Sequence, residues 1–461
     1  MADLGNSPSS RDIASVLHPY TNLVAHGKSG PHLVQRGKGI FIYDDNGKEY
    51  IEGLAGLWCT SFGFGEDELV KAATEQLKRL PYYHLFAGKG SNPSIDLAEK
   101  LLQIAPANFS KVFFANSGSE ANDTMIKLVW YYNNAIGRPA KKKIISRLKG
   151  YHGVTVAAAS LTGLPYAHNA FDLPIERIRH TVCPSFYHGA KQGESEAEFA
   201  DRMADELEAL ILGEGPETVA AFIAEPIMGA GGVILPPEGY FPKVQAVLQR
   251  YDVLMVADEV ICGFGRTGNM WGSETYEIQP DILTCAKALS SAYLPISAVL
   301  INEPMFQAIR KQSDELGVFG HGFTYTGHPV CAAVAYRTLQ LMEERQILAH
   351  VRRVSPRFQA RLHGFAEHPL VGQSRGIALI GGIELAADKA KRQPYDPALK
   401  MGAKLAALAQ AEGLIIRALP GDVLAFCPPL IIAEDQIDEM FDRFARALDK
   451  FAAEHSKQAA E

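Results

Sequence analysis

The chain has 461 residues, of which 47% are hydrophobic and 21% are charged, a composition typical of a large globular protein. Its net charge of −7 gives no reason to expect a nucleic acid or an anionic membrane as a partner. The longest apolar runs fall well short of the ~20 residues that a membrane-spanning helix needs. The six cysteines lack CxxC spacing and the first residues lack a secretory signal pattern, so we expect a cytoplasmic protein without disulfides or a zinc site.

The N-terminal segment is expected to join the body of the protein rather than to fold alone. Residues 1–31 are punctuated by serine and glycine, and we expect them to wrap around the rest of the chain. A β-hairpin is predicted within residues 33–53, because Asn46-Gly47 is a strong two-residue turn signal between two strand-like runs. The apolar loop at 54–59 contains Leu57 and Trp58, whose side chains either pack in the core or line a pocket.

An anion-binding turn is predicted where a strand gives way to a long helix. In chain order we expect helices at 66–79 and 94–104, a short buried strand at 111–115, a helix opened by residues 116–122 and ending near 136, strands at 143–147 and 218–224, and a loop with a charged helix at 177–212. The run N-S-G-S-E-A-N at 116–122 places free amides and the positive end of the helix dipole at one spot. Ser117 and Ser119 can add hydroxyl donors. The alternative is a plain capping box between Ser117 and Glu120.

Two strands are predicted to carry an acid and an amine to the same edge of a parallel sheet. The apolar run 253–257 ends in Asp258, and the run 282–286 ends in Lys287. Continuous apolar runs are typical of buried parallel strands, whose ligands lie beyond the carboxyl ends. Pyridoxal phosphate requires this pair, because a lysine forms a Schiff base with it and an acid partners its pyridine nitrogen. Taken alone, the pair also fits an aspartate in a turn and a surface lysine.

The C-terminal part follows a turn-rich stretch at 320–329. We expect a long helix from 330 to about 349, strands at 378–385 and 413–417, helices at 400–412 and 435–453, and a frayed tail at 452–461. Arg417 ends one of these strands and offers a fork for a carboxylate, unless it is an ordinary surface arginine.

The motif D-E-V-I-C-G-F-G-R-T-G, which begins at Asp258 and is followed by Lys287, resembles the class III aminotransferases of the omega-transaminase type, including those that act on omega-amino acids or β-alanine with pyruvate. The resemblance covers residues from about 31 to 444. It implies the α/β, PLP-dependent transferase fold of the aspartate aminotransferase type (fold type I). Residues 61–330 would form a large domain around a mostly parallel seven-stranded sheet. Residues 331–461, joined by 1–60, would form a smaller α+β domain.

The resemblance also implies a set of site residues around pyridoxal 5′-phosphate. Lys287 and Asp258 would be catalytic, and no metal is expected. The cofactor-binding residues would be Ser117, Gly118, Ser119, Tyr151, Glu225, Asp258, Val260, Lys287, Phe323 and Thr324. The substrate would meet Leu57, Trp58, Phe86, Tyr151, Ala230 and Arg417. Thr324 would donate to the phosphate held by a neighbouring subunit, which implies a homodimer with shared active sites, with a tetramer as a larger assembly to consider.

The implied function is a ping-pong transfer of an amino group from an omega-amino acid, a primary amine or a diamine to pyruvate. Three alternatives stay open at this point: an aminomutase of the glutamate-1-semialdehyde type, a decarboxylase or racemase, and a catalytically decayed homologue that still binds the cofactor. One departure supports the last alternative. The family usually has glycine after the Schiff-base lysine, whereas Ala288 stands here and restricts the backbone more than glycine would.

Overall fold

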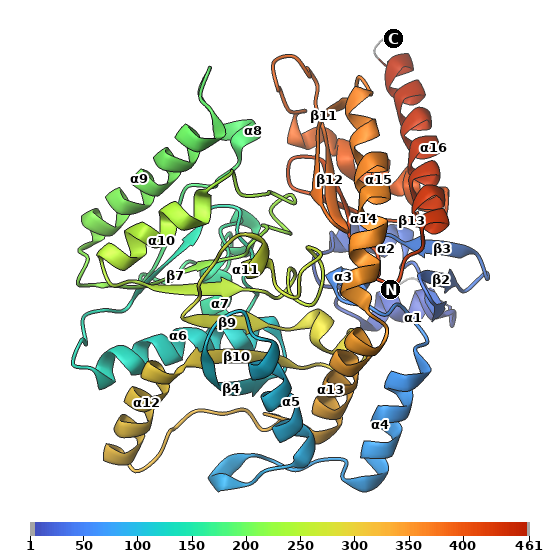
Figure 1. The fold of residues 1–461 in the computed structure, drawn as a ribbon. Helices are drawn as coiled ribbons and strands as arrows, with labels where there is room; N and C mark the ends of the chain where they lie inside the picture. Colours follow the sequence, from blue (N-terminus) through green and yellow to red (C-terminus); the bar gives the residue numbers. More distant parts are fainter. Residues whose placement is uncertain (1–4, 459–461) are drawn as a thin grey trace.

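The computed structural model describes residues 5–458 and is built around a seven-stranded sheet (Figure 1). The sheet has the order β4-β10-β9-β8-β7-β5-β6. Its strands are β4 (Phe109–Ala115), β5 (Lys143–Arg147), β6 (Ile178–Thr181), β7 (Val219–Ala224), β8 (Leu254–Asp258), β9 (Ile282–Cys285) and β10 (Ser297–Asn302). Neighbouring strands from β9 to β6 are parallel, and β10 runs antiparallel to both β9 and β4. The predicted fold, with a mostly parallel seven-stranded sheet, is confirmed.

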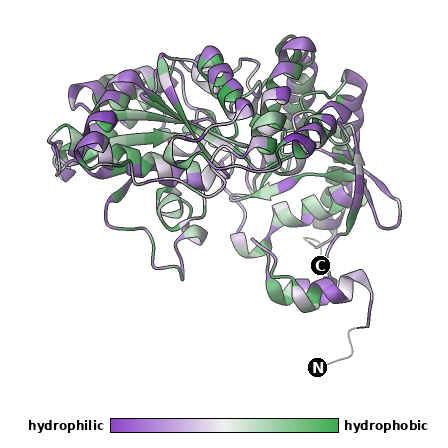
Figure 2. Cartoon of the chain, turned by 90° about the horizontal axis from the view of Figure 1, so that it is seen from below, coloured by the Kyte–Doolittle hydropathy of each residue, from purple (hydrophilic) through white to green (hydrophobic). Residues whose placement is uncertain are grey.

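Helices cover both faces of this sheet, which explains why its central strands are almost entirely apolar. Along β7 all six residues are buried. Phe222 faces α9 (Glu196–Glu214) and α10 (Tyr240–Arg250), whereas Ile223 packs in the cluster under α6 (Gly118–Ala135). Successive strand residues point to opposite faces, so two covered faces demand an unbroken hydrophobic run. Figure 1 shows α9 and α10 on one side of the sheet and α6 on the other, and Figure 2 shows the hydrophobic strands between them.

Two four-stranded sheets form the other half of the molecule and bring the two ends of the chain together. One contains β1 (Val34–Lys38), β2 (Phe41–Asp44), β3 (Glu49–Glu52) and β13 (Leu414–Ile415). The other contains β11 (Val371–Ile377), β12 (Ile380–Leu385), β15 (Val423–Phe426) and β14 (Arg417–Leu419). Because β13 pairs with β3, the N-terminal strands lie beside the C-terminal chain. The hairpin around Asn46-Gly47 is confirmed.

Several predicted boundaries in the C-terminal part were wrong. The single strand expected at 413–417 is two short strands, β13 and β14, which belong to different sheets. The helix expected to reach about 349 ends at Glu344, where Gln346 adopts φ 49° between α13 (Pro329–Glu344) and α14 (Ile347–Gly364). The predicted frayed tail is helical up to Gln458 in α16 (Glu434–Gln458), and 459–461 lie outside the described residues. Strands β1, β6, β10, β11 and β15 were not predicted at all.

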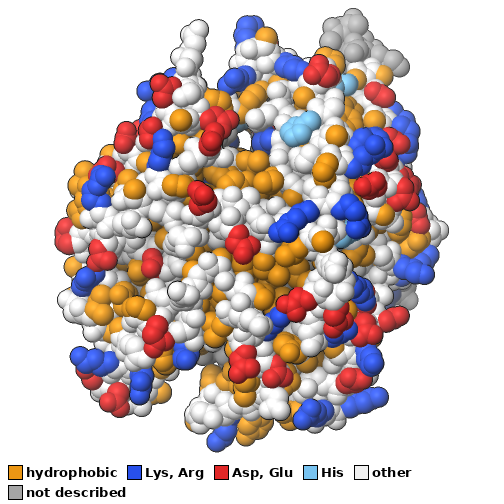
Figure 3. Space-filling model, viewed as in Figure 1, with side chains coloured by type: hydrophobic (Ala, Val, Ile, Leu, Met, Phe, Trp, Pro, Cys, Tyr) orange, Lys and Arg blue, Asp and Glu red, His pale blue; other side chains and the backbone are white. Residues whose placement is uncertain are grey.

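The remaining helices complete the layers. They are α1 (Pro8–Ser15), α2 (Leu23–Ser29), α3 (Ala55–Trp58), α4 (Asp67–Arg79), α5 (Asn92–Ile104), α7 (Val156–Leu161), α8 (Phe186–Gly189), α11 (Gly272–Thr275), α12 (Glu303–Glu315) and α15 (Met401–Ala411). Within residues 5–458, no helix has the length and apolar content to cross a bilayer. Charged side chains of both signs are scattered over the face in Figure 3, with hydrophobic patches between them.

Candidate active site

The acid and the amine predicted to meet do lie in one cavity at the carboxyl ends of neighbouring strands. Asp258 is the last residue of β8, Lys287 follows β9 by two residues, and Glu225 follows β7 directly. All three line a cavity of about 160 Å³. The other lining residues are Tyr20, Leu57, Trp58, Gly118, Ser119, Asn122, Tyr151, His152, Gly153, Tyr166, Ala230, Val260, Ile261 and Arg417. The parallel order of β7, β8 and β9 thus creates the site.

Asp258 is a buried carboxylate held by three hydrogen bonds. His152 Nδ1 donates to its Oδ2 over 2.8 Å, Asn122 Nδ2 donates to the same oxygen over 3.0 Å, and Val260 N donates to Oδ1 over 3.1 Å. Burial by itself would raise the pKa of Asp258, but the bonds from His152 and Asn122 outweigh it and hold that pKa below its ordinary value. Asp258 is therefore charged at neutral pH, as a partner for a protonated ring nitrogen must be.

Lys287 begins a short 3-10 turn, Lys287–Ser290, in a strained backbone conformation. Its φ is 48°, in the left-handed region that side-chain-bearing residues rarely adopt and that is often found at functional sites. Burial lowers the pKa of Lys287, and the negative charge of Asp258 opposes that shift. The next residue, Ala288, has no positive φ and packs in the core. Alanine therefore imposes no backbone strain after Lys287, and the sequence-based argument for a decayed site loses its support.

The predicted anion turn has the geometry of a helix start with one free hydroxyl. Ser117 caps α6 by accepting from Glu120 N, and its side chain does not line the cavity. The expected capping box is incomplete, because Glu120 accepts from Asn116 N instead of from Ser117 N. Ser119 Oγ accepts from Val154 N over 3.1 Å and donates no hydrogen bond within the described residues. Gly118 allows a close approach, since a Cβ there would lie 3.2 Å from Val260 Cγ1.

Glu225 and Tyr151 form the wall next to the acid. Glu225 Oε1 accepts from Tyr151 N over 2.9 Å, and its Oε2 accepts from Gly229 N over 3.0 Å. Burial raises the pKa of Glu225 above its ordinary value. The hydroxyl of Tyr151 meets the hydroxyl of Tyr20 at 3.5 Å. The predicted cofactor-binding residues Tyr151 and Val260 therefore both line the cavity. Glu225 lines it too, and its carboxylate fixes the Tyr151 turn through the backbone amide of Tyr151.

Aromatic side chains and one arginine form the outer part of the cavity. Trp58 is buried with φ 65°, and the preceding Ala55 also has a positive φ of 50°, so this loop is held in a costly conformation. Leu57 and Ala230 line the cavity as predicted. Arg417 forms no ion pair with any acid among residues 5–458, and its guanidinium lies 5.9 Å from the centre of the Tyr20 ring. A half-buried, unpaired guanidinium is suited to bind a ligand carboxylate.

Besides Ser117, three predicted residues lie away from this cavity. Phe86 is 47% exposed and lines a separate surface groove, where its ring packs against Gly322. Phe323 and the exposed Thr324 follow in the same turn-rich segment. None of the three lines the cavity in this chain, so their roles stay predictions, and those of Phe323 and Thr324 involve a second subunit.

Sequence reasoning missed Tyr20, Asn122, His152 and Tyr166 as site residues. The hydrogen bond from His152 to Asp258 makes His152 part of the site. Tyr20 and Tyr166 carry no local signal, because they reach the cavity from a linker and a short 3-10 helix that sequence patterns do not place. Asn122 lies one turn into α6, and the i, i+4 relation to Gly118 could have indicated the same helix face.

The cavity fits pyridoxal phosphate by the chemistry of its lining. A charged carboxylate and a lysine amine share it, and a helix start offers backbone amides and a serine hydroxyl free to donate. Tyr151 and Val260 supply an aromatic face and a branched aliphatic wall of a kind that accepts a flat ring. Each polar end of the cofactor therefore has a matching group in this chain.

Comparisons with known proteins agree with this geometry. Residues 24–448 match the family model described as "Aminotransferase class-III". The chain is 52% identical to gamma aminobutyrate transaminase 3, chloroplastic, of Solanum lycopersicum, over 91% of this chain and 80% of that protein. It is also 52% identical to gamma-aminobutyrate transaminase 1, mitochondrial, of Oryza sativa subsp. japonica, over 91% of this chain and 81% of that protein.

Solved structures extend the likeness to three dimensions. The omega transaminase from Pseudomonas jessenii in complex with PMP shares 54% identity with a TM-score of 0.96, covering 97% of this chain and 99% of that chain. Both the family match and the identities span most of the chain, and class III aminotransferases use pyridoxal phosphate. The chain belongs to the class III aminotransferases and is a pyridoxal-phosphate-dependent transaminase.

Proposed function

We propose that this transaminase moves the amino group of an omega-amino acid or a primary amine, including diamines, to pyruvate by a ping-pong mechanism. One observation carries the proposal: the unpaired guanidinium of Arg417 lines the same cavity as Lys287, next to aromatic walls. An omega-amino acid can place its amine at Lys287 and its distant carboxylate at Arg417. Pyruvate can use the same arginine in the second half of the cycle.

The residues of the cavity divide the work as follows. Lys287 binds the cofactor covalently between turnovers and moves the proton at the substrate carbon as general acid and base. Burial lowers its pKa, which favours the neutral amine that must accept a proton. With the cofactor bound, Asp258 would hold the proton on the ring nitrogen, and Gly118 with Ser119 would hold the phosphate. The bound cofactor supplies the electron sink for the substrate carbon.

The names of related proteins support the donor class. The matched plant proteins are named as transaminases of gamma-aminobutyrate, which is an omega-amino acid. A solved neighbour is an omega transaminase variant with a tryptophan replaced by glycine, engineered for synthesis of bulky amines. Trp58 lines the cavity here, so we propose that its ring limits the size of the donor. The relatives give no support to an aminomutase.

We further propose a cytoplasmic homodimer in which each cavity is completed by the neighbouring subunit. Phe86, Phe323 and Thr324 lie outside the cavity of their own chain, with Phe86 and Thr324 exposed. The resemblance to omega-transaminases assigns Phe323 and Thr324 to the neighbouring site, and we propose the same for Phe86. The domain boundaries at residues 60 and 330 belong to the same proposal. All six cysteines are free, which suits a reducing compartment.

Half-reactions of wild type and Arg417→Leu test the proposal. Donors would be gamma-aminobutyrate, β-alanine, a diamine and a neutral aryl amine, and the acceptor would be pyruvate with alanine as the measured product. A hydrogen-bonded charge pair contributes about 1.5–3 kcal/mol, so the variant should lose roughly 10- to 150-fold in kcat/KM for the amino acids and pyruvate. The neutral aryl amine should change by less than about threefold.

Arg353→Leu provides the matched control, since Arg353 is an exposed arginine that does not line the cavity. Equal losses for charged and neutral donors in Arg417→Leu would contradict the assigned role of Arg417. Failure of wild type to form alanine from any of the donors would contradict the proposed reaction.

A further inference from the structure

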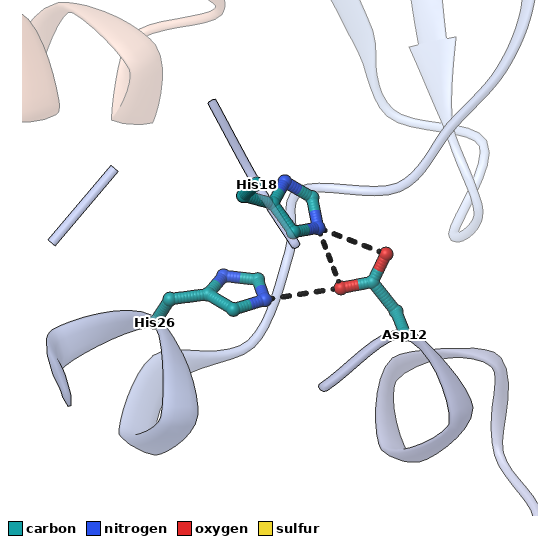
Figure 4. A group of neighbouring side chains, drawn as sticks. All are labelled: Asp12, His18 and His26. Carbon is teal, nitrogen blue, oxygen red and sulfur yellow. Dashed lines mark hydrogen bonds and ion pairs between the residues drawn. The ribbon is translucent and has the colours of Figure 1, made fainter. Parts of the chain in front are cut away.

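A cluster of two histidines and one aspartate lies in the N-terminal segment, outside the machinery described above. Asp12 belongs to α1, His18 to the linker after it and His26 to α2. His18 Nε2 lies 2.8 Å from Asp12 Oδ1 and 3.0 Å from Oδ2, and His26 Nε2 lies 3.0 Å from Oδ1. Figure 4 shows both rings pointing their Nε2 atoms at the same carboxylate.

We propose that Asp12, His18 and His26 bind one divalent transition-metal ion, with Zn²⁺ the best match, and that this ion joins α1 to α2. Two imidazole nitrogens and a carboxylate are a ligand set that zinc commonly takes, with water at the fourth position. The three ligand atoms lie within 4.8 Å of one another. Tetrahedral bonds of about 2.1 Å place neighbouring donors about 3.4 Å apart, so the contacts from Asp12 to the two histidines need to open by roughly 0.4–0.6 Å.

Burial distinguishes this cluster from ordinary surface residues. The exposed fractions of the side chains are 9% for His26, 18% for Asp12 and 28% for His18. The rings of His18 and His26 are 4.2 Å apart and tilted by 40°, so they converge without stacking. Partial exposure on the His18 side leaves access for the ion and its water. The spacing of the three residues in the sequence follows no zinc motif, which is why no metal was expected.

The N-terminal segment has little hydrophobic core, so a bound metal ion would contribute strongly to its stability. Neither α1 nor α2 contains a buried residue. Leu17 and Val24 are 80% and 72% exposed, so apolar contacts within this chain hold the segment weakly. Small elements without a core are commonly stabilised by metal ions or disulfides. The Asp12 cluster bridges α1, the linker and α2 at one point, which makes it the place where one ion would have the largest effect.

The metal would also fix a residue of the active site. Tyr20 lies in the same linker, between His18 and His26, with φ 52°. Its hydroxyl reaches the hydroxyl of Tyr151, and its ring meets that of Tyr166 edge-on at 5.7 Å. All three proposed ligands lie within about 10 positions of Tyr20 in the sequence. We therefore infer that the bound ion would hold Tyr20 against the cavity. This second step rests on the proposed function, whereas metal binding itself does not.

Metal content of the holoenzyme tests the site independently of activity. The chain, without a purification tag, is treated with chelator, equilibrated with about 10 µM free Zn²⁺ and analysed for bound zinc by elemental analysis. Wild type should bind one more ion per chain than His18→Ala/His26→Ala. The exposed His363→Ala is the control and should match wild type. Equal zinc in wild type and the double variant would overturn the proposal.

A milder variant guards against a folding defect. Asp12→Asn keeps an oxygen that accepts from both rings but loses the charge, so its zinc affinity should fall at least about tenfold. Trypsin cleavage at Arg11 and Lys28 gives a second readout: Zn²⁺ should slow it in wild type and leave Asp12→Asn unchanged. Unaltered cleavage in wild type with Zn²⁺ would exclude the joining of α1 to α2. Loss of transamination with zinc binding intact would count against the proposed function alone.

Discussion

Replacing His152 by phenylalanine should weaken the cofactor site without emptying the buried space. The His152 side chain has no exposed area, and its Nδ1 makes the shortest of the three bonds to Asp258, at 2.8 Å. Its Nε2 is buried without a partner, so the change removes one useful and one unsatisfied polar atom. A hydrogen bond to a charged group contributes about 1.5–3 kcal/mol, which corresponds to roughly 10- to 150-fold in an equilibrium constant.

The assay is the dissociation constant of pyridoxamine phosphate, which binds without a covalent bond to Lys287. In His152→Phe the pKa of Asp258 should rise by about one to two units, because one unit corresponds to about 1.36 kcal/mol. A carboxylate with a lowered pKa contributes stability that is lost as pH falls through that pKa. Raising the pKa of Asp258 by the substitution therefore moves this loss to a higher pH. The affinity of the variant should therefore fall more between pH 8 and about pH 5 than that of wild type.

His152→Asn provides the comparison, since its amide can still donate toward Asp258 although it leaves a void. It should retain more cofactor affinity than His152→Phe while losing more thermal stability. If His152→Phe binds pyridoxamine phosphate as tightly as wild type at both pH values, His152 does not hold Asp258 in its charged form and the reasoning fails.

Three further outcomes follow from the site and its surroundings. Lys287→Ala should lower turnover by at least about 100-fold, and borohydride should no longer attach the cofactor to the chain in the mass spectrum; retained turnover would refute the role of Lys287. Trp58→Ala should destabilise the fold by about 3–5 kcal/mol. Trp58→Gly should cost about 1–2 kcal/mol less, because glycine accepts φ 65° without strain. Urea unfolding measures both values, and equal values would show that the loop relaxes. Burial raises the pKa of Glu52 to about 7, so folding stability should fall as pH rises from 4.5 to 7. Glu52→Gln should remove that dependence and gain up to about 3 kcal/mol of stability at pH 9. An unchanged pH profile of stability in the variant would refute the role of Glu52.

The fold was predictable wherever local pattern and tertiary environment agree. The run that became β7 is apolar throughout, and the run that became β8 is apolar up to Asp258, because both sheet faces are covered. The boundaries of β5, β7 and β8 matched to within one residue. Strand β6, IRHT, was missed because it lies at the sheet edge and contains the half-buried polar residues Arg179 and His180 between its two buried ends. The break between β13 and β14 was also hidden, since one short apolar run was shared by two sheets that no local signal separates.

The sequence alone determined the chemistry of this protein: an acid and a lysine at the ends of parallel strands, a serine-glycine turn at a helix start, and a family motif between them. Those features are local, because strand ends and helix starts fix where their side chains emerge. Only the tertiary structure decided which distant residues complete the cavity. Tyr20, Tyr166 and Arg417 come from separate segments. His152 lies 106 residues before Asp258 in the chain, and its hydrogen bond keeps Asp258 in its charged form. Such contacts depend on how whole layers pack, and sequence patterns within one segment carry no record of that packing.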